Sequence, residues 1–420
     1  MYDILNYVSG FIWGPFTLIL ILGTGIFLSL GLKGFTLTYI AVAFKQLFSK
    51  EEDSSSGEIS SFQSLTTALS ATVGTGNIAG VATAIFVGGP GAIFWMWVSA
   101  VFGMATKFAE AFLAIKYREK NELGETIGGP MYYIKNGLTS KFIVFAYLFA
   151  TAGMIAALGI GNGVQVNSVS QVINNEFGFS TFSIGIVIAI LVALVILGGI
   201  KSIGNITSKL VPVMSLVYIL GGLLIIILNA NQVGYVFNLI VTSAFTTTAA
   251  TGGFAGATVW MALRYGVARG VFSNEAGLGS SPIAHAAAKT NNPVKQGMIS
   301  MLEPLIDTLI VCTITAFVIL MSNQWVGEIN GAVLTVASFE NLLANGKYIV
   351  IFGLILFSFS TIIGWSYYGE KCVEFLFGSG VIIYYRILWI VIIPVAASIE
   401  LNLMLSLIHI SEPTRRALIS

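Results

Sequence analysis

An octapeptide in the middle of an apolar segment decides the fold: Ser70-Ala71-Thr72-Val73-Gly74-Thr75-Gly76-Asn77. It mixes glycine with polar side chains, although residues 65–87 as a whole are apolar enough to cross a bilayer. An unpaired amide or carbonyl is costly in hydrocarbon, so a helix interrupted at this depth requires a polar cavity around it. The free N–H groups of the interruption attract a carboxylate, and its free carbonyls coordinate a small cation. The octapeptide therefore predicts a broken membrane helix beside a binding cavity.

A second run of the same kind lies inside residues 259–285. It is Gly270-Val271-Phe272-Ser273-Asn274-Glu275-Ala276-Gly277-Leu278-Gly279. Two interruptions near mid-membrane, separated by several spans, are typical of transporters built from two inverted repeats. Glycine-mediated helix packing is the alternative explanation, because small residues also let membrane helices approach closely.

The composition indicates that most of the molecular surface faces lipid. Of 420 residues, 56% are hydrophobic and only 9% are charged, whereas a globular domain carries about 25% charged residues. The net charge is +1, which argues against a nucleic-acid partner. Two cysteines and two histidines do not favour a disulfide framework or a histidine-rich metal site. We therefore expect an all-α polytopic membrane protein without a resident cofactor.

Ten apolar segments are long enough to be membrane spans. They are 12–32, 65–87, 92–115, 142–165, 182–200, 210–228, 259–285, 298–321, 348–367 and 381–399. Lysine and arginine gather in alternate loops, which the positive-inside rule requires if the N-terminus lies outside. Residues 236–250 are apolar but short, which predicts a re-entrant or surface helix. Residues 35–50 suit an amphipathic helix at the cytoplasmic interface.

Several charged residues lie inside the predicted spans, where a charge normally faces a partner or a wet cavity. They are Lys107, Glu110, Arg264, Arg269, Glu275, Glu303 and Asp307. Lys107 and Glu110 have the spacing of an i,i+3 ion pair on one helix. Arg264 and Arg269 fit either the outer approach to the second interruption or simple ion pairing.

At these residues the sequence resembles the alanine/glycine:cation symporter family. The matching motifs are Thr66-Thr67-Ala68-Leu69-Ser70 leading into Gly74-Thr75-Gly76-Asn77, Gly88-Gly89-Pro90-Gly91-Ala92-Ile93-Phe94-Trp95-Met96-Trp97, Gly128-Gly129-Pro130-Met131-Tyr132-Tyr133 and Asn274-Glu275-Ala276-Gly277-Leu278-Gly279-Ser280-Ser281. The resemblance extends from the first span to the ninth or tenth. It implies a five-plus-five inverted-repeat bundle similar to the leucine transporter, with one extra N-terminal helix. It also implies sodium-driven import of alanine, glycine or another small neutral amino acid.

Carried over residue by residue, the resemblance implies a set of substrate contacts. They are Thr75, Gly76, Asn77, Gln165, Phe272, Ser273, Thr361 and Trp365. Backbone N–H groups of the first interruption suit the carboxylate of an amino acid, and carbonyls near Phe272 with the Gln165 amide oxygen suit its ammonium. Phe272 and Trp365 would close a pocket too small for a branched side chain. An interfacial anchor is the alternative for Trp365.

The same resemblance places sodium between the second and ninth spans. Its ligands would be oxygen atoms of Ser70, Val73, Phe357, Ser360 and Thr361. The run Ser358-Phe359-Ser360-Thr361 is rich in hydroxyls at a depth where an unsatisfied hydroxyl is costly, which supports this placement. A second ion near Ala71 stays open.

We predict a single transporter domain over residues 1–405. It comprises the extra helix at 12–32, a first repeat at 62–228 and a second repeat at 259–400, whose last helix is missing. Residues 406–420 do not resemble the family and look like translated adapter sequence, so we expect the native sequence to stop near Leu405.

Sodium-coupled symport by alternating access across the cytoplasmic membrane is the predicted function, carried out by a monomer with lipid, sodium and an amino acid as partners. Proton coupling is the first alternative. An ion channel is the second, although no filter-like repeat is visible. An enzyme is not expected, because Gly-x-Ser-x-Gly, His-Glu-x-x-His and phosphate-loop patterns are absent from the sequence.

Overall fold

The computed structural model describes residues 13–49, 56–246 and 258–399. Within these ranges the chain is helical apart from loops and one antiparallel pair of short strands, β1 (Glu119–Lys120) and β2 (Thr126–Ile127). The predicted all-α class is confirmed. The predicted non-native tail at 406–420 lies outside the described residues.

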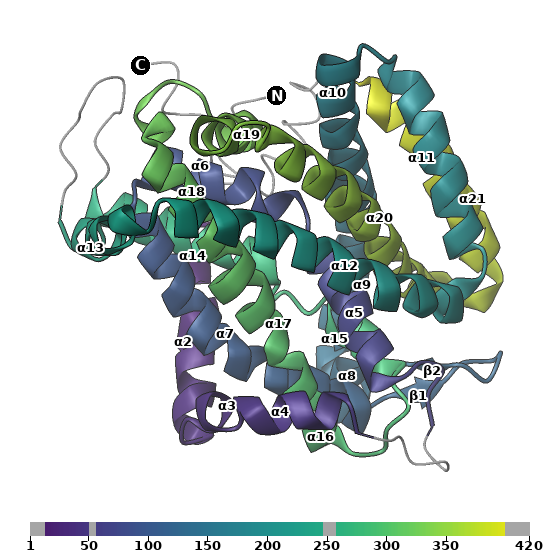
Figure 1. Cartoon of the computed structure of the whole chain (residues 1–420). Helices are drawn as coiled ribbons and strands as arrows, with labels where there is room; N and C mark the ends of the chain where they lie inside the picture. Colours follow the sequence, from purple (N-terminus) through teal and green to yellow (C-terminus); the bar gives the residue numbers. More distant parts are fainter. Residues whose placement is uncertain (1–12, 50–55, 247–257, 400–420) are drawn as a thin grey trace.

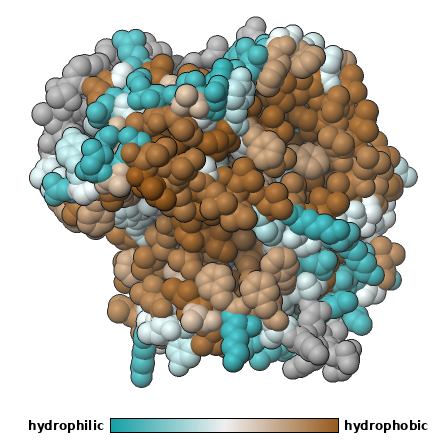
Figure 2. All heavy atoms as spheres, in the orientation of Figure 1, coloured by the Kyte–Doolittle hydropathy of each residue, from teal (hydrophilic) through white to brown (hydrophobic). Residues whose placement is uncertain are grey.

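Six helical stretches in the described part of the chain are long and apolar enough to cross a membrane. They are Gly91–Lys116, Ser140–Phe177, Gly199–Leu228, Pro293–Ser322, Lys347–Phe377 and Ser379–Ser398. Each coincides with one of the ten predicted spans. Figure 2 shows hydrophobic residues over most of one face of the molecule, with hydrophilic residues gathered toward its edges. The chain is therefore a multi-pass membrane protein.

The other four predicted spans are shorter or divided. Two are the apolar helices α2 (Pro15–Gly31) and α11 (Thr181–Ile196). The third is divided into α5 (Ser61–Thr72), the 3-10 turn η1 (Thr75–Asn77) and α6 (Ala79–Gly88). The fourth is divided into α14 (Val259–Asn274) and α15 (Pro282–Ala286). Both predicted interruptions are therefore present.

The second interruption begins later than the sequence predicted. Phe272 and Ser273 belong to the last turn of α14, and the non-helical stretch is 275–281. Ser273 and Asn274 remain helical because Asp307 and Thr308 hold their side chains, at 2.8 and 3.0 Å. The chain then turns through Gly277 and Gly279, at φ of 90° and 76°, which glycine adopts without steric cost.

The remaining helices surround these two broken ones (Figure 1). In chain order they are α3 (Phe35–Thr38), α4 (Ile40–Leu47), α7 (Gly91–Lys116), α8 (Pro130–Gly137), η2 (Ser140–Phe142), α9 (Ile143–Ala156), η3 (Ala157–Val164), α10 (Gln165–Phe177), α12 (Gly199–Leu228), η4 (Ala230–Gln232), α13 (Val233–Ser243), α16 (Pro293–Ser300), α17 (Leu302–Pro304), η5 (Leu305–Cys312), α18 (Thr313–Ser322), η6 (Gln324–Val326), α19 (Gly331–Leu342), α20 (Lys347–Phe377), η7 (Ser379–Val381) and α21 (Ile382–Ser398).

Three of these elements bear on the sequence predictions. The short helix α13 lies where a re-entrant or surface helix was predicted. The fourth span continues through α10 to Phe177, beyond its predicted end at 165. Helix α19 was not predicted, although Leu334 and Phe339 bury it against its neighbours.

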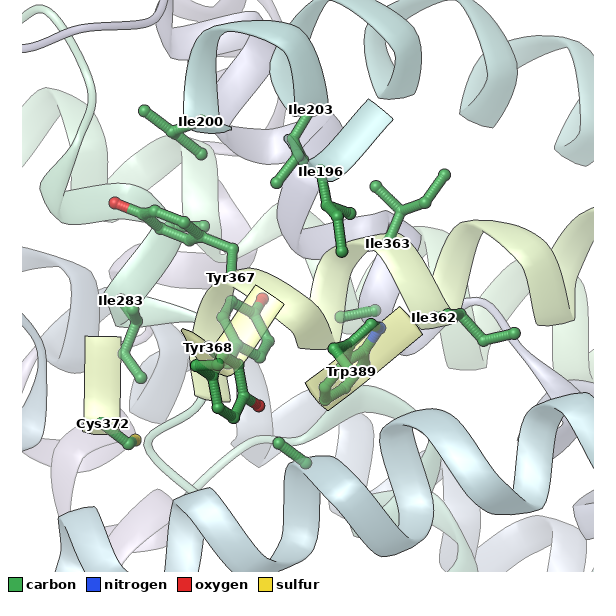
Figure 3. Packing of buried hydrophobic residues seen from close by; sticks show 14 of the residues in the cluster. Ile196, Ile200, Ile203, Ile283, Ile362, Ile363, Tyr367, Tyr368, Cys372 and Trp389 are labelled. Carbon is green, nitrogen blue, oxygen red and sulfur yellow. The ribbon is translucent and has the colours of Figure 1, made fainter. Parts of the chain in front are cut away.

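The largest cluster of buried apolar residues lies between α20 and the helices around it. Figure 3 shows part of it, where Tyr367 and Tyr368 of α20 pack with Trp389 of α21 and Ile200 of α12. Helix α20 also packs along α5 and η3, and α7 packs along α14. Both broken helices are therefore held against long unbroken ones.

Candidate functional site

The side chain of Asn77 fixes the shape of the backbone at the first break. Helix α5 ends at Thr72, and Gly74 is extended, at φ −145° and ψ −152°. The Asn77 Oδ1 atom accepts the Gly74 N–H at 2.8 Å, which replaces a hydrogen bond that the helix has lost. Asn77 also donates from Nδ2 to Oδ1 of Asp307 at 2.5 Å and to Oγ of Ser273 at 3.1 Å. The break is therefore a fixed shape and not a frayed helix end.

A cavity of about 390 Å³ adjoins both breaks. Six of the eight predicted substrate residues lie in its wall: Thr75, Gly76, Gln165, Phe272, Thr361 and Trp365. The breaks also approach each other directly, because a Cβ atom added to Gly76 would lie 3.6 Å from Cδ1 of Phe272. Residues from four separate segments of the chain thus meet around one space.

The other two predicted residues, Asn77 and Ser273, lie behind the wall and not in it. Both are buried, and both donate to the Asp307 carboxylate of η5. Asp307 is itself fully buried and also accepts from the hydroxyl of Thr308 at 2.7 Å. Asn77 and Ser273 therefore form a clamp that joins both breaks to η5.

The cavity is larger than the small pocket predicted from Phe272 and Trp365. It continues past Trp365 along α9, where Ala152, Gly153 and Ala156 leave room. Pockets of a few hundred Å³ hold ligands well above the size of alanine. This extension could not be predicted from the sequence, because small residues occur on a lipid-exposed helix whether or not they border a cavity.

Four polar residues of the wall were not among the predicted substrate contacts: Thr72, Glu275, Ser280 and Tyr368. Two signals for them exist in the sequence. Glu275 is a charged residue in the middle of a predicted span, and such residues face cavities. Tyr368 follows Trp365 by three positions, which puts both on one face of α20.

The two breaks present opposite ends of the backbone dipole to the cavity. Thr75 and Gly76 stand at the start of η1, where N–H groups have no carbonyl in a preceding turn. Helix α14 ends at Asn274, so its last carbonyls form a negative end beside Phe272. A positive end and a negative end on one cavity match the two charges of a zwitterion.

The five predicted cation ligands lie on two neighbouring segments, the end of α5 and the middle of α20, which pack against each other. The Thr361 hydroxyl lies 3.5 Å from the Val73 carbonyl, and the Ser360 hydroxyl donates to the Phe357 carbonyl at 2.9 Å. The helices approach closely at Gly364, whose added Cβ atom would lie 2.6 Å from Oγ of Ser70. All five residues are buried. The cluster consists of carbonyl and hydroxyl oxygens, which are suitable donors for an alkali cation; ion binding stays a prediction.

Beneath the second break lies a buried ionic network. The Lys107 ammonium contacts Oε2 of Glu303 at 2.9 Å, and His285 Nε2 lies 2.6 Å from Oε1 of the same carboxylate. The predicted pairing of Lys107 with Glu110 is wrong. Lys107 reaches across to α17, while Glu110 accepts the N–H of Gly279 at 3.2 Å. The network ties α7, α15 and α17 together below the cavity.

The two arginines of α14 contact aromatic rings. The Arg269 guanidinium carbon lies 6.0 Å from the ring centroid of Phe272, and that of Arg264 lies 5.8 Å from the ring of Tyr265. Arg269 is therefore next to a residue of the cavity wall, and its role at the approach to the break stays a prediction.

The sequence is similar to those of known transporters. The sequence pattern of the "Sodium:alanine symporter family" matches residues 1–413. The sodium/alanine symporter AgcS of Methanococcus maripaludis is 51% identical over 397 residues, which cover 93% of this chain and 87% of that protein. A putative sodium/proton-dependent alanine carrier of Bacillus subtilis, YrbD, is 40% identical over 391 residues, covering 90% and 79%.

Among solved structures, MhsT in complex with L-phenylalanine superimposes with a TM-score of 0.59. The match covers 86% of this chain and 87% of that chain at 12% sequence identity, so it shows the fold alone. The predicted leucine-transporter-like arrangement is thereby confirmed.

Proposed function

Because the chain belongs to the sodium:alanine symporter family, we propose that it imports alanine or glycine together with sodium across the cytoplasmic membrane. One observation carries this proposal. Thr361 lies in the cavity wall and also reaches the Val73 carbonyl in the cation cluster. A single residue thus belongs to both candidate sites, which is what coupling between two solutes requires.

The amino acid would lie across the two breaks. Its carboxylate would accept from the N–H groups of Thr75 and Gly76, at the positive end of the first break. Gln165 donates weakly to the Ile160 carbonyl at 3.4 Å, and no described residue bonds its buried Oε1 atom. That oxygen is therefore available to the substrate's ammonium. Phe272 and Trp365 would cover the bound molecule.

Sodium would bind between Val73 of the first break and Ser360 and Thr361 of α20. Together with the Asn77 side chain, the ion would stabilise the extended backbone at Gly74 that presents the neighbouring N–H groups. Sodium would raise the affinity for the amino acid, and the amino acid would raise the affinity for sodium by the same factor. The two repeats would then rock around the loaded site, with the N-terminus outside and one chain as the working unit.

Proton coupling is the second candidate. It is favoured by the relative named as a putative sodium/proton-dependent alanine carrier, which is 40% identical to this chain. Alanine uptake measured with a proton ionophore and with a sodium ionophore separates proton coupling from sodium coupling, because the two ionophores collapse different gradients.

Uptake of labelled L-alanine into proteoliposomes tests the proposal. We expect saturable accumulation that requires an inward sodium gradient and is abolished by a sodium ionophore. Gln165→Ala and Thr361→Ala should weaken uptake, whereas Asn205→Ala, an exposed position on α12, should not. Non-saturating flux would identify a channel, and wild-type uptake by both cavity variants would remove the assigned site.

A further inference from the structure

The cavity wall contains the carboxylate of Glu275, which has no role in the proposed transport mechanism. Glu275 lies in the wall and is only 3% exposed. It directly follows α14 in the left-handed conformation, at φ 56°. Helix ends favour glycine at this position, because a side chain there is strained. A glutamate at such a place indicates that its side chain is needed.

Glu275 has no ion-pair partner among the residues that the structure describes. The Ser280 hydroxyl donates to its Oε2 atom. The charge of Lys107 acts on Glu275 through space, but the Lys107 ammonium contacts Glu303 instead. A buried carboxylate without a counter-charge is costly, and a cationic ligand in the cavity would supply that charge.

A second polar group of the wall also lacks a partner. The Tyr368 hydroxyl is buried and bonds to no described residue, and Tyr368 lies in the cavity wall with Glu275. Figure 3 shows Tyr368 on α20 in the same region as Cys372 and Ile283, two further residues of this wall. A buried hydroxyl without a hydrogen-bond partner is also costly, and a polar group of a ligand in the cavity would supply that partner.

The charge of Glu275 adds to that of the helix it follows. The last carbonyls of α14 already form a negative end, and the carboxylate stands beside them. We propose that Glu275 is the counter-charge for the substrate's ammonium group, with the Tyr368 hydroxyl as a further hydrogen-bond partner. The proposal rests on the proposed function and names the feature that selects the substrate. A neutral amino acid binds, its hydroxy-acid analogue lacks the cation, and an acidic side chain is repelled.

Binding of labelled L-alanine to the purified full-length chain in sodium tests this, with L-lactate as the competitor that differs only in carrying a hydroxyl for the ammonium. We expect Glu275→Gln to weaken alanine binding about 30-fold or more, the effect of removing one partner of a buried charge pair. Its preference for alanine over lactate should shrink in parallel. The matched control is Glu110→Gln, which changes a buried carboxylate near the same break but outside the wall. This variant should keep the wild-type affinity for alanine and the wild-type preference for alanine over lactate.

Tyr368→Phe keeps the test decisive if Glu275→Gln does not fold. Loss of the hydroxyl should weaken alanine binding about fivefold. Wild-type alanine affinity in folded Glu275→Gln would overturn the proposal and leave the proposed function standing. Lactate that binds the wild type as tightly as alanine would overturn it without any variant. Failure of the wild type to bind alanine at all would instead contradict the proposed function.

Discussion

The two helix breaks differ in what holds them open. The first is short, and Asn77 fixes its shape by accepting the Gly74 N–H and donating to the buried Asp307 carboxylate. The second is longer, turns through left-handed residues and rests on the buried Lys107–Glu303 pair. A break held by a short set of hydrogen bonds can present N–H groups at fixed positions, whereas a longer break next to a buried ion pair can respond to a charged ligand. We infer that the first and second breaks have different roles in the site.

The largest effect is expected from the support of the second break. Lys107→Met leaves the Glu303 carboxylate buried without its ammonium partner, which typically costs about 3–5 kcal/mol. Chemical unfolding in detergent measures the loss. Lys116→Met, at an exposed position on the same helix, serves as the control. Equal stability of the two variants would show that the ion pair does not support the break.

The next largest effect is expected at the first break. Asn77→Ala removes the acceptor for the Gly74 N–H and a donor to the buried Asp307 carboxylate, which should cost about 2–3 kcal/mol. Alanine uptake should disappear, because the backbone at Gly74 is no longer fixed. Combining the change with Asp307→Asn should cost less than the sum of the single variants. Strict additivity would mean that the two side chains act independently.

Glu275→Gly should change stability and binding in opposite directions. Glycine relieves the left-handed strain at the end of α14, which should stabilise the fold by about 1 kcal/mol. Alanine affinity should fall, because the negative charge is lost. Thermal unfolding and alanine binding on the same preparation measure both effects. A variant that is less stable and binds normally would contradict the roles given to the backbone and the carboxylate.

The smallest effect is expected outside both breaks. Lys371 contacts the part-exposed Glu125 of the β1–β2 loop at 3.1 Å. Partial burial alone would raise the pKa of Glu125, but the Lys371 ammonium, the Asn121 side chain and the charge of Arg386 together outweigh burial and lower it. A lowered pKa means that the pair stabilises the fold above about pH 4.3, the usual value for a glutamate, and that this is lost as pH falls through the lower folded pKa. Glu125→Gln should therefore cost less than about 1 kcal/mol near neutral pH.

The stability difference between the wild type and Glu125→Gln should also vanish in acid. Unfolding measured at neutral and acidic pH checks both statements. If Glu125→Gln lowered the free energy of unfolding as much as Lys107→Met, the part-exposed Lys371–Glu125 pair would not differ in strength from the buried Lys107–Glu303 pair.

The sequence predicted the features that depend on local pattern. Glycine among polar residues in an apolar segment located the first break, since this pattern favours an interrupted helix beside a polar cavity. It placed the start of the second too early, because Ser273 and Asn274 belong to the last turn of α14, where their side chains also bond to η5. The partner of Lys107 lies 196 residues away, and no local spacing reveals it. The size of the cavity depends on how α9 packs against α20, which is likewise a long-range property.

A structure of the purified protein determined with L-alanine and sodium tests the central claim most directly. We predict that the alanine carboxylate lies within hydrogen-bond distance of the Thr75 and Gly76 N–H groups. Its ammonium should lie at the end of α14, with sodium between Val73 and Thr361. Alanine bound elsewhere, with both breaks facing an empty cavity, would contradict the account.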